Sequence, residues 1–495
     1  MIIMERKIFI IKVIAVVLLC IILVISGYQY YSLARKLYDT EIDRGGKGYV
    51  SDEVWYVSSA RNILNKIFKV EPRIDDNKYG VTIVYNKTIL NVTYVRRIIR
   101  EYNFSVKIVD TRYYEINAIY FEANNPSELN QLISILRDTG GVIDVTWGWR
   151  LADAAGINRY LNLEHPPMVK YLIGLSMLVF GDNPFNWRIP SIIAGVLTVL
   201  FTYLASEALT KNKWLSLVIS LFTGIDPITR ILASIALLDI YVALFTAIVM
   251  YLVFSKRYKL ALLIVIIGSL FKFNVLFAAI PVIILLVRND LSRDQRIPTL
   301  IFSVFKYFLV SITLFLCVQI TASIPLILHG GFNWWIENAI FGAIKWHTSV
   351  KCTSPGCPIS SAPWDWFIGN NGFPIYYFST DNSLTALGFW PLWSIALAYS
   401  ILFLPYYRYD RKIGFPLLMF YGVFAGYVLL YIIGGRTQYS FYSVQFTPII
   451  YVYLLTTFTY IVLNPTKLSQ TIILWSNILL RIWRFILKEV LLINK

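Results

Sequence analysis

Residues 8–25 read Ile8-Phe9-Ile10-Ile11-Lys12-Val13-Ile14-Ala15-Val16-Val17-Leu18-Leu19-Cys20-Ile21-Ile22-Leu23-Val24-Ile25. This run contains one charged residue, Lys12, and its length is close to the roughly 20 apolar residues that a helix needs to cross a bilayer. Similar runs recur along the chain, the last of them at residues 442–463. They predict a polytopic α-helical membrane protein with about ten or eleven spanning helices.

The composition agrees with lipid as the main solvent. Of 495 residues, 57% are hydrophobic and 15% are charged, whereas a soluble domain has about 25% charged residues. The formal charge of +16 is spread over short connectors, at residues 5–7, 211–213, 255–259, 288–296, 408–412 and 467. Because no single basic patch forms, we expect no nucleic-acid partner. Every second connector is basic, so the positive-inside rule places these connectors and the amino terminus in the cytoplasm. We expect a multi-pass protein of the plasma membrane.

The first apolar run is interpreted as a retained anchor, because no small-x-small cleavage site follows it. The outer side is expected to begin near Tyr30. Further spans are expected at residues 188–209, 214–228, 238–254, 260–287 as a hairpin, 301–327, 389–404, 415–433 and 442–463. A second outer loop is expected at 329–387, and the tail at 471–493 is either a last span or a helix lying on the membrane surface.

The polar stretch between the first two spans has a pattern of its own. Strand-like runs at 81–85, 105–110, 114–122 and 142–147 and helix-like runs at 91–102 and 125–139 follow the order strand, helix, strand, strand, helix, strand. This is the order of a ferredoxin-like unit. Three Asn-x-Ser/Thr triplets within it fit an extracytoplasmic location and, with the abundant Ile and Lys, favour an archaeal source. We divide the chain into residues 1–68, an α+β ferredoxin-like insert at 69–149, and a multi-helix membrane domain at 150–495.

Polar side chains near the outer ends of the apolar runs are candidates for function, because a charge at the centre of a membrane helix costs at least about 2.5 kcal/mol. They are Asp52, Glu53, His165, Lys170, Asp226, Arg230, Asp239, Lys272, His347 and Arg436. The segment Ser51-Asp52-Glu53 has two interpretations. Ser51 could cap a helix whose first-turn acids favour the dipole, or Asp52 could be a general base at the membrane surface.

Several motifs extend this list in a fixed order. Asp52-Glu53 is followed by His165-Pro166-Pro167-Met168-Val169-Lys170 and by Asn183-Pro184-Phe185-Asn186-Trp187-Arg188. These motifs, with residues 235–240, 268–273, 361–366 and 436–442, resemble the protein O-mannosyltransferase family and the related aminoarabinose transferases. Where the family has an arginine, this chain has Ser234, and Arg230 one turn earlier could cover the same face.

The resemblance implies a C-type glycosyltransferase fold and a polyprenyl-phosphate or dolichyl-phosphate sugar as donor. It implies transfer of the sugar, mannose in the family, to a hydroxyl of a protein, lipid or glycan on the extracytoplasmic face. An inverting transfer needs a base for the acceptor hydroxyl and cations for the departing phosphate. Asp52 is the expected base, and Glu53 is expected to orient the acceptor or a neighbouring cation.

The remaining candidates receive expected roles. Lys272 and Arg436 are expected to bind the donor phosphate, with Arg230 and Lys170 as reserves; Lys170 could instead only snorkel to the interface. His165 could orient Asp52 or pack, His347 is a weaker candidate, and Asp239 could bind substrate, although we favour an ion pair with Arg230. Five tryptophans of the second outer loop could stack on a sugar: Trp334, Trp335, Trp346, Trp364 and Trp366.

Cys352 and Cys357 could form a disulfide in that outer loop, since an oxidising exterior permits one. We expect no required cofactor, because arginine and lysine can handle a leaving phosphate, but a divalent metal is not excluded. Three other classes compete: a transporter, which should show inverted repeats or broken midplane helices; an oligosaccharyltransferase, which should carry a Trp-Trp-Asp motif where this chain has Trp334-Trp335-Ile336; and a non-catalytic scaffold.

Overall fold

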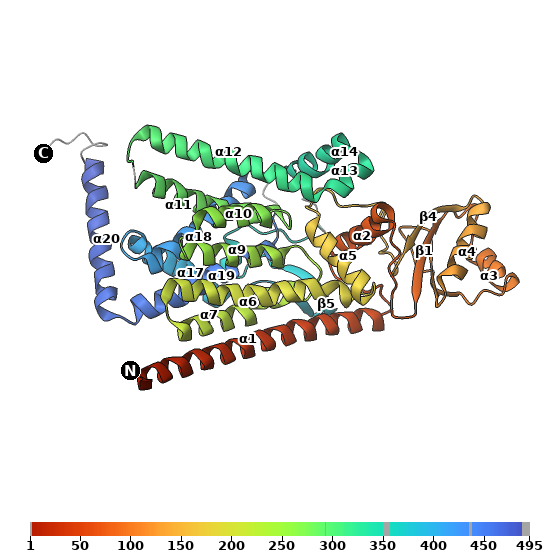
Figure 1. The fold of residues 1–495 in the computed structure, drawn as a ribbon, viewed down its shortest axis with the longest axis horizontal. Helices are drawn as coiled ribbons and strands as arrows, with labels where there is room; N and C mark the ends of the chain where they lie inside the picture. The colour runs from red at the N-terminus through yellow and green to blue at the C-terminus, as the bar shows by residue number, and fades with distance from the viewer. Residues whose placement is uncertain (1, 293, 350–356, 435–437, 488–495) are drawn as a thin grey trace.

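The computed structural model describes residues 2–292, 294–349, 357–434 and 438–487. It is a bundle of membrane helices with a small α+β module at one end (Figure 1). Among the described residues, six helical stretches are long and apolar enough to cross a membrane, or seven if one bent pair counts as a span. Four shorter apolar helices accompany them, and the expected total of ten or eleven spans stays a prediction.

The first helix, α1 (Ile2–Asp43), is 42 residues long and continues well past the end expected near Tyr30. Its last turns stay helical because they are packed: Leu33, Ala34 and Leu37 are all buried. The Arg188 guanidinium also donates a hydrogen bond to the Ala34 carbonyl at 2.9 Å. The helix therefore runs along the bundle to the base of the module (Figure 1).

The helices of the membrane region mostly follow the expected spans, except for α5, which the sequence did not predict. They are α5 (Met168–Phe180), α6 (Ile189–Thr210), α7 (Lys213–Ile225), α8 (Pro227–Ala233), α9 (Asp239–Phe254), α10 (Tyr258–Gly268), α11 (Ala279–Leu291), α12 (Ile297–Ala322), α17 (Trp390–Leu402), α18 (Arg411–Ile433) and α19 (Phe446–Thr457). The α7–α8 pair bends by 61°. The bend follows from Pro227 and from the Asp226 carboxylate, which accepts a hydrogen bond from the Ile228 amide at 3.0 Å.

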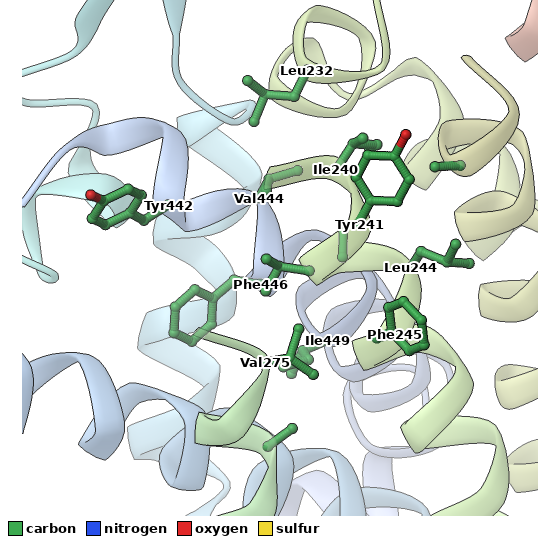
Figure 2. Packing of buried hydrophobic residues seen from close by; sticks show 14 of the residues in the cluster. Leu232, Ile240, Tyr241, Leu244, Phe245, Val275, Tyr442, Val444, Phe446 and Ile449 are labelled. Atoms are coloured by element: carbon green, nitrogen blue, oxygen red, sulfur yellow. The ribbon is translucent and has the colours of Figure 1, made fainter. Parts of the chain in front are cut away.

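Shorter elements connect these helices on the module side. They are α13 (Ile324–Gly330), α14 (Phe332–Ile336), α15 (Gly342–Thr348), α16 (Asp365–Ile368), the hairpin β5 (Phe373–Ser379) and β6 (Asn382–Ala386), and the 3-10 turns η2 (Asn186–Arg188), η3 (Phe273–Ala278) and η6 (Ser440–Gln445). Buried side chains of α8, α9, η3, η6 and α19 meet in the centre of the bundle, as Figure 2 shows for Leu232, Tyr241, Val275, Val444 and Phe446.

The carboxy-terminal helix, α20 (Pro465–Phe485), runs across the ends of the other helices at the end of the bundle far from the module (Figure 1). It does not belong to the six candidate spans found among the described residues. Of the two interpretations of the tail, the structure therefore favours the helix that lies on the membrane surface.

The module contains β1 (Tyr79–Tyr85), α3 (Val92–Glu101), β2 (Lys107–Asp110), β3 (Ala118–Ala123), α4 (Pro126–Asp138) and β4 (Val142–Trp147). Its sheet has the order β2-β3-β1-β4 with antiparallel pairs throughout, so the ferredoxin-like prediction is confirmed. Asn91 and Asn125 cap the two helices, as their side chains accept hydrogen bonds from the first turns.

The two faces of this sheet have different partners. One face packs on α3 and α4 around Val81, Ile119 and Phe121. The other face packs on the loop after β4, where Val84 and Ala118 join Leu151 and Ile157 in a second cluster. That loop leads back to the membrane, so the module is packed against the segment that carries the candidate site.

Candidate active site

Asp52 lies directly before the short helix α2 (Glu53–Asn62), at the module end of the bundle. The expected Ser51 cap is wrong: the N-cap position is Asp52, and no side chain caps this helix. Ser51 instead has a φ of +52°, a left-handed conformation that is uncommon outside glycine and costs on the order of 1–3 kcal/mol. Such a turn persists only where its neighbours hold it.

Glu53 holds this turn. Its carboxylate accepts two hydrogen bonds from the Arg188 guanidinium, both at 2.8 Å, and one each from the backbone amides of Val50 and Ala236, also at 2.8 Å. The carboxylate is completely buried. Of the two expected roles for Glu53, the geometry therefore fits orientation of a neighbouring cation, which is Arg188.

A second buried ion pair supports the same helix. Asp182 accepts hydrogen bonds from the Arg61 guanidinium at 2.5 and 2.9 Å, from the Trp187 indole at 2.6 Å and from the Trp149 amide at 2.9 Å. Gly148 makes room for it, since a Cβ there would lie 2.1 Å from the Asp182 carboxylate. The sequence reasoning gave Asp182, Arg61 and Arg188 no role, although Arg188 closes the quoted Asn-Pro-Phe-x-Trp-Arg motif and Asp182 directly precedes it.

Asp52 itself lines a cavity of about 510 Å³. The wall of the cavity is rich in aromatic rings and contains a second carboxylate, with Trp55, Tyr56, Tyr160, Asn162, Glu164, His165, Trp346, Phe373, Tyr439 and Phe441 among the lining residues. Burial and the adjacent Glu164 carboxylate raise the pKa of Tyr160. Tyr160 is therefore a neutral phenol at physiological pH.

His165 lies in the loop that precedes α5, and Lys170 lies in the first turn of α5. The Lys170 amine donates to three main-chain carbonyls, those of Leu161, Asn162 and His165. The lysine thus fixes the cavity wall, and this geometry fits a positioning role better than the reserve phosphate contact. The His165 ring packs edge-on to Tyr56, with centroids 5.5 Å apart.

Lys272 and Asp239 form a buried ion pair of 2.6 Å. The favoured pairing of Asp239 with Arg230 is therefore wrong: Arg230 points outward from α8 and is exposed. Lys272 directly precedes η3. The chain reverses direction between α10 and η3, and this places Lys272 next to Asp239 at the start of α9. Its ammonium also lies 4.3 Å from the centroid of the Tyr442 ring. Because Tyr442 follows Phe441, which lines the cavity, the pair sits next to the Asp52 site.

The tryptophans of the second outer loop separate into two groups. Trp366 is fully buried and donates its indole N–H to the Ser361 hydroxyl at 2.7 Å, and Trp335 is also buried. The expected sugar stacking by these two rings is wrong, because they belong to the core. Trp364 is exposed and lies edge-on to Tyr431 at 5.2 Å, while Trp346 lines the cavity.

Two expectations fall on residues outside the described parts of the chain. Arg436 is one of them, and Cys352, the partner in the expected disulfide with Cys357, is the other. Within the described ranges, no three His, Cys, Asp or Glu residues gather closely enough to hold a metal ion. The absence of a metal requirement stays a prediction.

An apolar groove adjoins the cavity. It has a volume of about 340 Å³ and is lined by Phe273, Phe277, Phe315, Ile340, Ile344, His347 and Leu430, among others. The His347 ring in this groove lies 6.2 Å from the His165 ring in the polar cavity. A second apolar groove of about 430 Å³ lies between α5, α6 and α9. Polar and apolar binding surfaces are thus neighbours at one end of the bundle.

Residues 164–321 match the family model described as dolichyl-phosphate-mannose-protein mannosyltransferase. The resemblance to this mannosyltransferase family is confirmed over that segment. The segment carries His165, Lys170, Asp239 and Lys272, and Asp52 lies before it. The segment that matches this family model therefore contributes His165 to the cavity and both partners of the Asp239–Lys272 ion pair.

The matched relatives are similar over a limited length. The polyprenol-phosphate-mannose–protein mannosyltransferases of Mycolicibacterium smegmatis strains ATCC 700084 / mc(2)155 and MKD8 are each 26% identical over 86 residues, which is 17% of this chain and 17% of theirs. Two structures of ArnT from Cupriavidus metallidurans, bound to undecaprenyl phosphate and in the apo state, cover 63% of this chain and 52% of theirs, with TM-scores of 0.37 and 0.39 at 15% and 14% identity. These TM-scores are too low to assign the fold by comparison, so the fold is defined by the chain's own helices and sheet.

Proposed function

We propose that this chain is a membrane glycosyltransferase that transfers a sugar from a polyprenyl-phosphate donor to an acceptor hydroxyl at the extracytoplasmic face. The observation that carries the proposal is the position of Asp52, held in a polar, aromatic-lined cavity that adjoins an apolar groove. By analogy with the matched family, the sugar is mannose and the acceptor is a protein, a lipid or a glycan.

In this proposal Asp52 removes the proton of the acceptor hydroxyl while the hydroxyl oxygen attacks the anomeric carbon of the donor. The bond between that carbon and the phosphate oxygen breaks, and the polyprenyl phosphate leaves with the electron pair. Attack opposite the leaving group inverts the anomeric configuration. A general base contributes about 10²–10⁴-fold to the rate when it lies within hydrogen-bonding reach of the proton.

Cations next to the cavity would stabilise the charge that develops on the departing phosphate. Lys272 is the best placed of the described cations, since it lies beside the Asp52 cavity, in contact with the ring of Tyr442. Its partner Asp239 holds the ammonium in place at 2.6 Å. Arg436 is proposed as a second contact from the sequence resemblance alone.

The apolar groove supports a polyprenyl donor over a nucleotide-sugar donor. It is lined almost entirely by carbon, and it approaches the cavity through His347 and His165. A polyprenyl chain in this groove would place its phosphate where the groove meets the polar cavity. The basic connectors between α6 and α7, between α9 and α10 and between α11 and α12 lie at the opposite end of the bundle (Figure 1), which supports an extracytoplasmic site and a cytoplasmic amino terminus.

The test uses purified protein reconstituted in lipid and supplied with polyprenyl-phosphate sugars and candidate acceptors, with products identified by mass spectrometry. Asp52→Asn keeps the shape of the side chain and removes its basicity, so we expect turnover to fall by at least about a hundredfold. Asp39→Asn is the control, because Asp39 lies exposed on α1 in an ion pair with Arg35. Unchanged turnover in Asp52→Asn would exclude Asp52 as the base.

A further inference from the structure

Glu164 is the second carboxylate of the cavity, and the transfer described above does not use it. The Tyr160 hydroxyl donates a hydrogen bond to Oε1 of Glu164. The Asn162 amide donates to the same oxygen at 3.1 Å and to the Tyr160 oxygen at 2.7 Å. Among the described residues, Oε2 of Glu164 receives no hydrogen bond and no ion pair. One oxygen is thus fixed, and the other remains as an acceptor in a cavity wall.

The residues that orient Glu164 are themselves held in place. The Tyr160 ring lies edge-on to Trp55, with centroids 5.5 Å apart. The main-chain carbonyl of Tyr160 accepts a hydrogen bond from the Asn62 side chain at 2.9 Å. The carbonyl of Asn162 accepts from the buried Lys170 amine. Because α2 and α5 both contribute to this support, the carboxylate is preorganised before any ligand binds.

We propose that Glu164, oriented by Tyr160 and Asn162, binds hydroxyl groups of the transferred sugar and makes the cavity selective for glycosyl groups without an acidic substituent. The inference rests on the proposed function and specifies the class of sugar that the donor carries. Tyr160 and Asn162 act as positioning residues for Glu164, while Glu164 itself contacts the sugar.

The chemistry of the side chains favours a sugar hydroxyl as the ligand. An ionised carboxylate only accepts hydrogen bonds, so its unoccupied oxygen fits the O–H groups of a sugar and repels a phosphate. The aromatic rings of Trp55, Trp346 and Phe441 line the same cavity and suit the C–H faces of a pyranose.

The charge of the cavity wall gives the selectivity. Glu164 lines the cavity, and the buried Lys170 amine donates to main-chain carbonyls behind the wall. A uronic acid would bring a second carboxylate next to that of Glu164. Like charges in a partly desolvated site repel one another strongly, so a hexuronosyl donor would be rejected by the same residue that binds a neutral hexosyl donor.

The experiment measures the dissociation constants of three ligands for protein in lipid nanodiscs: bare polyprenyl phosphate, polyprenyl-phosphate hexose and polyprenyl-phosphate hexuronate. Glu164→Gln should leave binding of the bare polyprenyl phosphate unchanged and weaken binding of the hexose donor by about tenfold to a hundredfold, because a hydrogen bond to a charged group is lost. The same variant should bind the hexuronate donor more tightly than the wild type does. Tyr160→Phe, which keeps the ring contact with Trp55, should show the same changes at a smaller size.

Glu101→Gln, at the exposed end of α3, is the matched control and should change none of the three constants. Equal dissociation constants for the hexose donor in Glu164→Gln and wild type would overturn the inference and leave the proposed function standing. Failure of the wild type to bind any of the three ligands would overturn the proposed function itself. If Glu164→Gln does not fold, as judged by its binding of bare polyprenyl phosphate, Tyr160→Phe decides the question.

Discussion

Glu53 and Arg188, which are 135 residues apart in the sequence, form a bidentate ion pair. Both of its hydrogen bonds are 2.8 Å long, and neither side chain is exposed. The pair joins the residue after the proposed base to the residue that opens α6. It explains why an acidic pair near the first helix and an arginine far along the chain belong to one set of motifs: one residue of the acidic pair faces the cavity and the other anchors it.

Arg188→Met should therefore cost about 3–5 kcal/mol of stability, because it leaves the Glu53 carboxylate buried without its cation. Thermal unfolding of the detergent-solubilised protein measures the change, and turnover should fall with it as the Asp52 turn loosens. Asp39→Asn, at an exposed position of α1, supplies the comparison and should leave the unfolding temperature unchanged. An unaltered unfolding temperature in Arg188→Met would contradict the anchoring role.

Much of the fold was predictable because it depends on local pattern. Apolar run length located α6, α9 and α18 within a few residues, and the alternation of strand-like and helix-like runs gave the module its correct topology. The far end of α1 was not predictable, because residues 31–43 stay helical through packing against a distant part of the chain. The Asp226 turn shows the same limit: its carboxylate also bonds to Trp393 and Tyr451, which no local pattern reveals.

The sequence predicted which residues belong to the site better than it predicted which residues pair with one another. The motifs selected Asp52, His165 and Lys272, and the structure brings the first two to one cavity and the third beside it. Pairing failed where two cations competed for one acid: Arg230 is one turn from the expected position, but the hairpin after α10 delivers Lys272 to Asp239 instead. Glu164 had no signal beyond its place before His165.

Lys272 can be tested apart from its structural role. Lys272→Met should destabilise the protein by about 3–5 kcal/mol, because Asp239 is left buried and uncompensated. Adding Asp239→Leu removes the orphaned charge, so the double variant should recover most of the unfolding temperature. If Lys272 stabilises the departing phosphate, turnover should stay low in the double variant. Recovery of turnover together with stability would assign Lys272 a structural role only.

The module should be fastened through Asn65, which lies in η1 (Ile63–Phe68), the π-helical turn that follows α2. Its amide donates to the Trp147 carbonyl at 3.1 Å and its carbonyl oxygen accepts from the Trp147 amide at 2.7 Å. Asn65→Ala leaves both backbone groups without these bonds, at a cost of about 1–3 kcal/mol for each buried group. Hydrogen exchange should then accelerate at β4 and α2. Asn125→Ala, which removes the cap of α4, should accelerate exchange at α4 and leave β4 protected.

Two tryptophans of the segment 329–387 should respond oppositely to truncation. Trp366 is fully buried against Tyr427 and Phe446, so Trp366→Ala should cost about 3–5 kcal/mol of stability. Trp346 is 44% exposed and lines the Asp52 cavity, so Trp346→Ala should leave the unfolding temperature nearly unchanged and lower kcat/KM through a higher KM for the donor. Unfolding curves and steady-state kinetics on both variants separate the cases. A stable Trp346→Ala enzyme with unchanged KM would remove this ring from the proposed sugar site.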